Sequence, residues 1–217
     1  MASDIRNSHT TRASKHSVMP PYIVLRDFLD EATVAELLDY ALSRQSDFEP
    51  TRLGSKAVDP TIRISTGLRD IGRYRDLLRT KILGLMPDFI AQLRVTPFKP
   101  ARLETELVAH GDGAFYTRHV DTQVARYDDV EHIRVLSGVY YFNTEPKAFS
   151  GGSFRLHAIG GNPSVDFADI EPIRNSLLVF PSWAPHEVMP VHCPSQRFAD
   201  SRFAINCWLH RKKPSKA

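Results

Sequence analysis

Two histidines and one aspartate carry the clearest chemical signal in this sequence. His119 and Asp121 lie two positions apart in segment 114–122, which is predicted to form a strand. Since side chains alternate across a strand, both should point to one face. His186 comes three residues after an apolar run, 177–183, that is typical of a buried strand. Two imidazoles and a carboxylate presented inward by a β-barrel can bind Fe(II) and leave three positions open for a bidentate cosubstrate and O₂.

Other catalytic patterns do not fit. His186 and Glu187 do not begin an H-E-x-x-H zinc motif, because no second histidine follows at the required spacing. The two cysteines, Cys193 and Cys207, are not at zinc-binding spacing, and so few cysteines also exclude a disulfide scaffold. The glycines form no nucleotide-binding motif, and the G-x-S-x-G of serine hydrolases is absent.

An arginine on the strand after the distal histidine is the next candidate. Arg202 opens the segment 202–210, and its guanidinium can bind a carboxylate through two hydrogen bonds. If the cosubstrate is 2-oxoglutarate, its 5-carboxylate needs such a cation at the far end of the pocket. Arg197 is the rival, but the residues after it are more typical of a loop. On the predicted strand, Asn206 and Trp208 share a face with Arg202 and would line the pocket.

Six segments follow each other in an order that matches a known family. They are FYTRHVDT (115–122), RVLSGVYYFN (134–143), SGGSFRL (150–156), FADIEP (167–172), PHEV (185–188) and RFAINCWL (202–209). The set resembles the Fe(II)/2-oxoglutarate-dependent dioxygenases, in particular the prolyl 4-hydroxylase-like branch that includes the hypoxia-sensing prolyl hydroxylases. The resemblance covers about half the chain.

This resemblance has consequences for fold and chemistry. It implies a double-stranded β-helix, or jelly roll, flanked by N-terminal helices. It implies oxidative decarboxylation of 2-oxoglutarate to succinate and CO₂, coupled to hydroxylation of a C–H bond. The implied cofactors are Fe(2+), 2-oxoglutarate as cosubstrate, and O₂, with ascorbate as an accessory reductant.

The resemblance also assigns roles to individual residues. His119, Asp121 and His186 fall on the iron ligands, and Arg202 falls on the arginine that binds the 5-carboxylate. Two further positions complete the cosubstrate site: Tyr141, the second tyrosine of VYYFN, supports that carboxylate, and Phe154 is an apolar lining residue.

Two departures leave the substrate open. Ala109 stands where we expect the hypoxia-type enzymes to carry a tyrosine that faces the cosubstrate, and the segment after the HVD strand also differs. The substrate is therefore a small amino-acid-like metabolite or a peptidyl proline. The alternative function is a non-catalytic jelly-roll module used for metal binding or for sensing. Asp121 argues against halogenation, since a halogenase needs that ligand position vacated for halide.

Two long polar segments, 46–68 and 122–133, are expected to rim the mouth of the barrel. Their basic residues could meet a substrate carboxylate; these are Arg52, Lys56, Arg63 and Arg126. The other histidines of the β part, His110, His132 and His157, are expected at the surface or in loops.

The elements that must position these residues fall into two groups. Asp30 is a good N-cap for a helix over 31–45, and a second apolar stripe predicts a helix over 71–93 that breaks near Met86 because of Pro87. After Pro97, eight strand-like segments follow without helical pattern between them. The predicted fold is mainly β, a jelly-roll core with N-terminal helices against it.

The predicted organisation is a flexible tail (1–18), one catalytic domain (19–211) and a basic tail (212–217). Within the domain, helical support covers 19–96 and the jelly-roll core 97–211. The chain has 217 residues and a net charge of +3, too mild to indicate a nucleic-acid partner. No apolar run is long enough to span a membrane, and no secretory signal is recognised. We expect a cytoplasmic enzyme with a small-molecule or peptide substrate; the sequence does not predict its oligomeric state.

Overall fold

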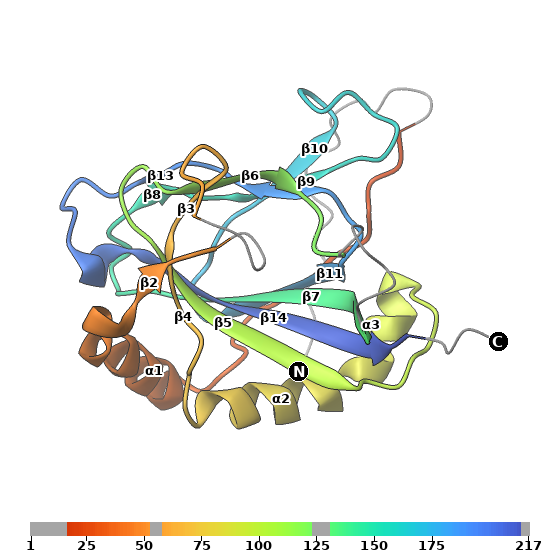
Figure 1. Cartoon of the computed structure of the whole chain (residues 1–217), viewed down its shortest axis with the longest axis horizontal. Helices are drawn as coiled ribbons and strands as arrows, with labels where there is room; N and C mark the ends of the chain where they lie inside the picture. The colour runs from red at the N-terminus through yellow and green to blue at the C-terminus, as the bar shows by residue number, and fades with distance from the viewer. Residues whose placement is uncertain (1–16, 53–57, 123–130, 214–217) are drawn as a thin grey trace.

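The computed structural model describes residues 17–52, 58–122 and 131–213, in which a larger and a smaller antiparallel sheet lie face to face (Figure 1). The strands of the larger sheet are β1 (Ile23–Leu25), β2 (Glu49–Pro50), β4 (Thr66–Leu68), β5 (Arg102–His110), β7 (His132–Phe142), β11 (Ser176–Pro181) and β14 (Arg202–Lys212). Their spatial order is β1–β11–β7–β14–β5–β4–β2. The long strand β14 therefore lies in the middle, between β7 and β5.

The smaller sheet lies across the site from the larger one. Its strands are β3 (Arg63–Ile64), β6 (Phe115–His119), β9 (Phe154–His157), β10 (Phe167–Ile170) and β12 (His186–Val188), in the spatial order β10–β9–β12–β6–β3. A short ribbon pairs β8 (Ser150–Gly151) with β13 (Val191–His192). Together the sheets form the jelly roll that the sequence predicted.

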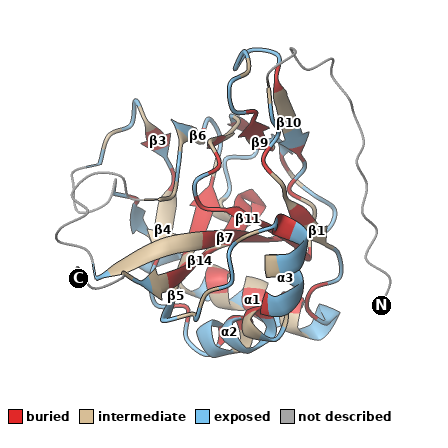
Figure 2. Ribbon diagram, turned by 90° about the vertical axis from the view of Figure 1, so that its right-hand side faces the viewer, coloured by how far each residue is buried: buried red, intermediate tan, exposed pale blue. Residues whose placement is uncertain are grey.

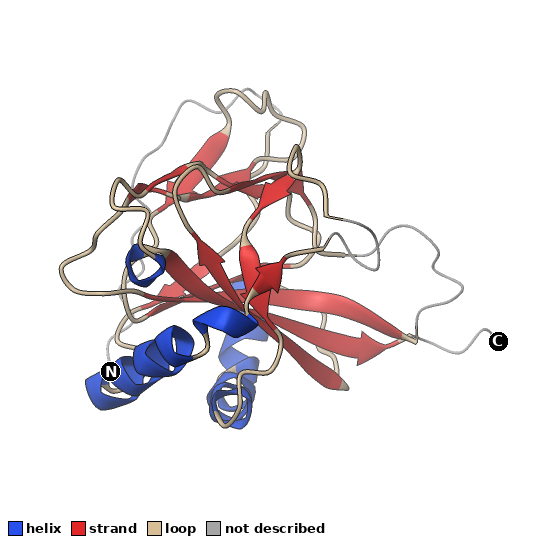
Figure 3. Cartoon of the chain, turned by 60° about the vertical axis from the view of Figure 1, so that its left-hand side comes forward, coloured by secondary structure: helices blue, strands red, loops and turns tan. Residues whose placement is uncertain are grey.

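Helices cover the outer face of the larger sheet (Figure 3). They are α1 (Glu31–Ser43), α2 (Tyr74–Gly84) and α3 (Met86–Leu93); short 3₁₀ turns, η1 (Gln45–Asp47) and η2 (Phe198–Asp200), lie elsewhere. Asp30 caps α1 as predicted, since its carboxylate accepts a hydrogen bond from the backbone N–H of Thr33 at 2.8 Å. The predicted break also occurs: α2 and α3 are separate helices that meet at Leu85, and Pro87 lies in the first turn of α3.

All eight predicted strand segments contain strands. Two of them are each divided into a pair: 151–159 contains the end of β8 and all of β9, and 186–191 contains β12 and the start of β13. The segment 46–68 holds β2, β3 and β4, consistent with its strand-and-loop prediction. Strand β1 was not predicted, because three residues are too short for a periodic signal.

Alternation on the central strands gives the larger sheet two buried faces (Figure 2). On β7, Tyr140 belongs to the core beneath the helices, whereas Tyr141 belongs to the core between the sheets. On β14, Cys207 lies on the helix side, and Ala204 lies on the inner side. The helices thus shield one face, and the other is left to form the site.

The predicted tails lie mostly outside the described residues. Val18, near the end of the predicted N-terminal tail, exchanges backbone hydrogen bonds with Ile159. Strand β14 continues to Lys212, one residue into the predicted C-terminal tail. None of the helices in the described ranges has the length and hydropathy needed to cross a membrane.

Asn175 ties the N-terminal segment to the larger sheet. Its Oδ1 accepts hydrogen bonds from the backbone N–H of Leu29 at 2.9 Å and from the hydroxyl of Tyr140 at 3.0 Å. Its Nδ2 donates to the Leu29 carbonyl at 2.8 Å. The residue is buried and has a φ of 57°, a conformation that asparagine tolerates better than most residues.

We therefore expect Asn175→Ala to lower the free energy of unfolding by about 2–4 kcal/mol, because buried partners lose their hydrogen bonds. Chemical denaturation measures the change. Gln196→Ala is the matched control, since Gln196 has a φ of 54° but is exposed. Equal losses in the two variants would show that backbone strain, not the side-chain bonds, sets the effect.

Candidate active site

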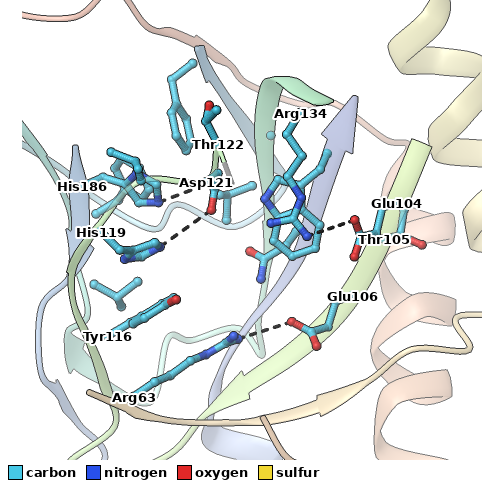
Figure 4. Close-up of a pocket in the computed structure, with 18 of the residues that line it drawn as sticks. Arg63, Glu104, Thr105, Glu106, Tyr116, His119, Asp121, Thr122, Arg134 and His186 are labelled. Carbon is cyan, nitrogen blue, oxygen red and sulfur yellow. Dashed lines mark hydrogen bonds and ion pairs between the residues drawn. The ribbon is translucent and has the colours of Figure 1, made fainter. Parts of the chain in front are cut away.

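The pairing of β6 with β12 brings the predicted triad together. His119, the last residue of β6, lies opposite His186, the first residue of β12. Asp121 follows two residues after His119. Its Oδ1 lies 3.8 Å from His119 Nε2, and its Oδ2 lies 3.8 Å from His186 Nε2 (Figure 4). One ligand atom from each residue lies within 4.8 Å of the others, close enough to share one metal ion.

Hydrogen bonds on the far side of each ring fix the imidazoles. His119 Nδ1 lies 2.8 Å from the Thr117 carbonyl, and His186 Nδ1 lies 2.9 Å from the Ala184 carbonyl. Because a carbonyl can only accept, each Nδ1 carries the proton and each Nε2 keeps a free lone pair. This is the tautomer that a metal ligand requires.

Asp121 is held from behind by a pair of hydroxyl groups. The hydroxyl of Ser137 on β7 donates to Asp121 Oδ2 at 2.7 Å, and it lies 2.9 Å from the hydroxyl of Ser182. The backbone N–H of Asp121 donates to the Ser182 carbonyl at 2.9 Å. Ser137 on the larger sheet, together with Ser182 just beyond β11, therefore orients the carboxylate of Asp121, which lies just beyond the end of β6, toward the histidines.

The charges of the triad suit metal binding. Burial, together with the neighbouring His186, lowers the pKa of His119 to about 3, so its imidazole is neutral at physiological pH. Burial alone would raise the pKa of Asp121, but the two histidines and the Ser137 hydroxyl outweigh it and lower that pKa. Neutral imidazole and ionised carboxylate are the forms that bind a cation.

Aromatic rings pack against both imidazoles. Tyr116 stacks on His119 with ring centroids 3.6 Å apart, and Phe154 stacks on His186 at 4.8 Å. Phe180 contacts the edge of the His186 ring. Phe154 lines the cavity and lies directly against a histidine of the triad; its role as an apolar lining residue of the cosubstrate site stays a prediction. These contacts limit the rotation of the two imidazoles.

Arg202 lies at the inner end of the same cavity and is almost fully buried. Its Nε donates to the Gly152 carbonyl at 2.7 Å, and its guanidinium lies 4.9 Å from the ring centre of Tyr141. Its Nη2 and the Tyr141 hydroxyl have no hydrogen-bond partner in the described residues. Buried polar groups without partners are rare, and these two fit a ligand carboxylate.

Gly152 is required where it touches this arginine. Its φ is 67°, and a Cβ atom there would lie 2.7 Å from Arg202 Cδ. Only glycine accommodates both the backbone conformation and the close approach.

His110 and its neighbour Ala109 both lie elsewhere than the sequence predicted. It was expected at the surface, but it is buried, and its Nδ1 lies 3.5 Å from Arg202 Nη1. Burial and the nearby cations Arg202 and Arg63 lower the pKa of His110 well below its usual range, so it is neutral. Ala109 does not face the cosubstrate end of the cavity; it packs in the core beneath the helices. At this end of β5, the residue that faces the cavity is His110.

Of the other residues discussed in the sequence analysis, some line the cavity and others lie outside it. Asn206 and Trp208 line the cavity on the same face of β14 as Arg202. Arg197 lies in an exposed turn and pairs with Asp200 at 2.8 Å, so it is not in the site. His157 is buried and contacts Glu187 at 2.9 Å, contrary to its expected surface position, whereas His132 is partly exposed. Arg126 and Lys56 lie outside the described residues.

The cavity has a volume of about 780 Å³. Its outer wall carries ion pairs that the sequence analysis missed: Arg63 with Glu106 at 3.4 Å, and Arg134 with Glu104 at 2.9 Å (Figure 4). The period-2 placement of Glu104 and Glu106 on the strand RLETELVAH was a usable signal, because it puts both carboxylates on one face. Tyr116 was missed because its role depends on stacking.

Comparison with known proteins gives the family. The model of the 2OG-Fe(II) oxygenase superfamily matches residues 105–210. An uncharacterized PKHD-type hydroxylase of Synechocystis sp. is 32% identical over 212 residues, which span 94% of this chain and 68% of that protein. The chain belongs to the 2OG-Fe(II) oxygenase superfamily. Within it, the chain is a 2-oxoglutarate-dependent hydroxylase, consistent with the triad and with the cavity beside it.

Solved structures of this superfamily share the fold. A prolyl-4-hydroxylase of Pseudomonas putida superposes with a TM-score of 0.64 at 24% identity, over 89% of this chain and 94% of that one. A prolyl hydroxylase of Trichoplax adhaerens, in complex with a hypoxia inducible factor peptide fragment, gives 0.65 at 20% identity, over 88% and 83%. At such identities the likeness establishes the jelly roll and leaves the substrate open.

We expect Arg202→Ala to raise the KM for 2-oxoglutarate by roughly 100-fold or more, since a buried carboxylate that loses its partner costs about 3–5 kcal/mol. Arg197→Ala is the matched control, because Arg197 is exposed and belongs to the turn before β14. Steady-state succinate release measures both. An effect confined to Arg197→Ala would place the carboxylate site elsewhere.

Proposed function

We propose that this enzyme hydroxylates a C–H bond of a small amino-acid-like molecule, with decarboxylation of 2-oxoglutarate to succinate and CO₂. The observation that carries the proposal is one cavity with the triad on one wall and Arg202 at its inner end, where Arg202 Nη2 and the hydroxyl of the adjacent Tyr141 have no hydrogen-bond partner among the described residues. A metal chelate and a carboxylate site are the two ends that bound 2-oxoglutarate needs.

His119, Asp121 and His186 would hold Fe(2+). Two imidazoles and a carboxylate are a donor set that Fe(II) accepts. The bound iron supplies the O₂ activation that couples loss of CO₂ to hydroxylation. The chain's own contribution is orientation: the carbonyls of Thr117 and Ala184 fix the tautomers, and Ser137 fixes the carboxylate.

Arg202 and Tyr141 would bind the 5-carboxylate of 2-oxoglutarate. The guanidinium supplies charge, and the hydroxyl supplies a second donor. His110, neutral and 3.5 Å from the guanidinium, adds a polar group at that end without adding charge. Apolar side chains, among them Phe154, Phe180 and Val139, line the same cavity and are buried.

The alternative, a metal-binding module without catalysis, has less support. Such a module has no need for a cosubstrate-sized cavity beside an open metal site. A peptidyl proline stays a second candidate substrate on the strength of the prolyl hydroxylase fold alone. Ascorbate as an accessory reductant and a cytoplasmic location stay predictions.

Arg63 was expected to meet a substrate carboxylate from a polar loop, but its charge is already paired. Its side chain is buried, donates from Nε to the Ser65 hydroxyl at 2.8 Å and pairs with Glu106. Arg52 is exposed, lines the cavity and has no ion-pair partner among the described residues. Of these two, Arg52 suits a charge-reversal test better.

His119→Ala and His186→Ala should abolish succinate release, because each removes a metal ligand.

Ser137→Ala should weaken Mn(II) binding by about 10- to 100-fold, because the carboxylate of Asp121 loses the hydrogen bond that orients it. Titration of Mn(II) into each variant measures the affinity. His192→Ala, whose ring is exposed, is the control. Unchanged Mn(II) affinity in both histidine variants would contradict the metal assignment.

Arg52→Glu should raise the substrate KM while 2-oxoglutarate decarboxylation without substrate stays at the wild-type rate. The physical reason is that the rim loses its attraction for a substrate carboxylate, while Arg202, the residue assigned to 2-oxoglutarate, is unchanged. Kinetics with and without substrate separate the two effects. If the substrate KM and the substrate-free decarboxylation rate both kept their wild-type values, Arg52 would have no role in selecting the substrate.

A further inference from the structure

The outer cavity wall is built from neighbouring positions on β5 and β14. In the register of these strands Glu106 lies opposite Asn206, and Glu104 lies opposite Trp208. All four line the cavity. Glu104 and Glu106 lie across the cavity from the triad (Figure 4), so a substrate that faces the iron would lie against this wall.

Glu104 is a carboxylate that already has two partners, one of them a cation. Its Oε2 accepts from Arg134 at 2.9 Å and from the ring of His210 at 3.0 Å. Burial alone would raise its pKa, but the His210 hydrogen bond and the Arg134 charge outweigh it and lower that pKa to about 2. Arg134 is itself held, since its guanidinium lies 4.1 Å from the ring centre of Trp208. The charge of Glu104 is therefore balanced within the protein, although Arg134 Nε and His210 Nδ1 have no hydrogen-bond partner among the described residues.

Glu106 lies two residues after Glu104 and on the same face of β5, but its carboxylate has fewer partners. Its contact with Arg63 is long, at 3.4 Å, and Arg63 directs its Nε to Ser65 and its face to the Tyr116 ring. Glu106 Oε1 has no hydrogen-bond partner among the described residues, and its side chain is 16% exposed. A carboxylate can accept about four hydrogen bonds, so most of its capacity is free.

Asn206 adds a second unused group. Its side chain is partly exposed to the cavity, and no hydrogen bond to it occurs within the described ranges. It can accept through its oxygen and donate through its nitrogen. A shielded carboxylate next to a free amide oxygen matches a protonated amine, which has several N–H donors and one positive charge.

We propose that Glu106, assisted by Asn206, binds the ammonium group of the substrate, and that this substrate is a free amino acid. The proposal rests on the proposed function and narrows it. Asp121 and Arg202 are committed to metal and cosubstrate, and Glu104 to Arg134. Of the cavity-lining carboxylates in the described chain, Glu106 is the one left for a cationic ligand.

The rim supplies the complementary charge. Arg52, Arg69 and Arg102 are exposed, line the cavity and have no carboxylate partner in the ranges that the structure describes. An amino acid with its ammonium at Glu106 would therefore turn its carboxylate toward a cationic rim. A residue inside a peptide carries neither charge, so this wall distinguishes the two candidate substrates.

The test uses the full chain loaded with Fe(II) and 2-oxoglutarate. The probes are the twenty free L-amino acids, their Nα-acetyl derivatives and a proline tripeptide blocked at both ends. Succinate release and product mass are measured. A free amino acid should stimulate turnover and gain one oxygen atom, whereas its acetyl derivative should not.

With that amino acid, Glu106→Gln should lower kcat/KM by about 10- to 100-fold, the range expected for loss of a charged hydrogen bond. Its Mn(II) affinity should stay at the wild-type value. Asn206→Ala should lower kcat/KM less. Asp39→Asn, on the exposed side of α1, is the charge-matched control and should change nothing.

The outcomes that overturn the inference are specific. Acetylated or peptide probes used as well as free amines, or no stimulation by any amine while 2-oxoglutarate is still consumed, would exclude recognition of an ammonium. Loss of Mn(II) affinity in Glu106→Gln would mean that Glu106 acts through Arg63, Tyr116 and His119. Absence of succinate under every condition, with metal bound, would remove the proposed function itself and this inference with it.

Discussion

The pairing of β6 with β12 is the constraint on which the site depends. It sets His119 opposite His186, and the chain then needs two more residues to bring Asp121 to the same point. The smaller sheet thus carries both histidines, and Asp121 lies just beyond the end of β6, while the larger sheet carries Ser137, which fixes the carboxylate, and Arg202, which closes the cavity. Any slip of one residue in either sheet would turn these side chains to the opposite face.

The N-terminal half serves this geometry indirectly. Helices α1 to α3 bury the outer face of the larger sheet, so its inner face can carry polar and charged residues without exposing the apolar alternates to water. Asn175 joins the segment before α1 to β7, because it accepts hydrogen bonds from both Leu29 and Tyr140. The cost of building Arg202, His110 and Tyr141 into a dry interior is offset by apolar burial elsewhere in the sheet.

Much of this was accessible from the sequence, for physical reasons that also explain the gaps. Strand alternation separates Tyr141 from Tyr140, and the proline rule places the helix break, because both depend on local geometry. His110 was misjudged since the glycines that follow it indicate a loop, while its burial depends on pairing with Arg202, far along the chain. Glu106 was missed because a charge at alternate positions is usually a solvent-facing one, and which carboxylate stays unsaturated depends on side-chain packing.

The most direct test of the central claim is an anaerobic crystal structure of the enzyme with Fe(II) and 2-oxoglutarate. Anomalous scattering should place one iron between Nε2 of His119, Nε2 of His186 and the carboxylate of Asp121. Electron density for 2-oxoglutarate should run from that iron to Nη2 of Arg202 and the hydroxyl of Tyr141. Iron bound elsewhere, or a cosubstrate whose distal carboxylate lies on another arginine, would contradict the account.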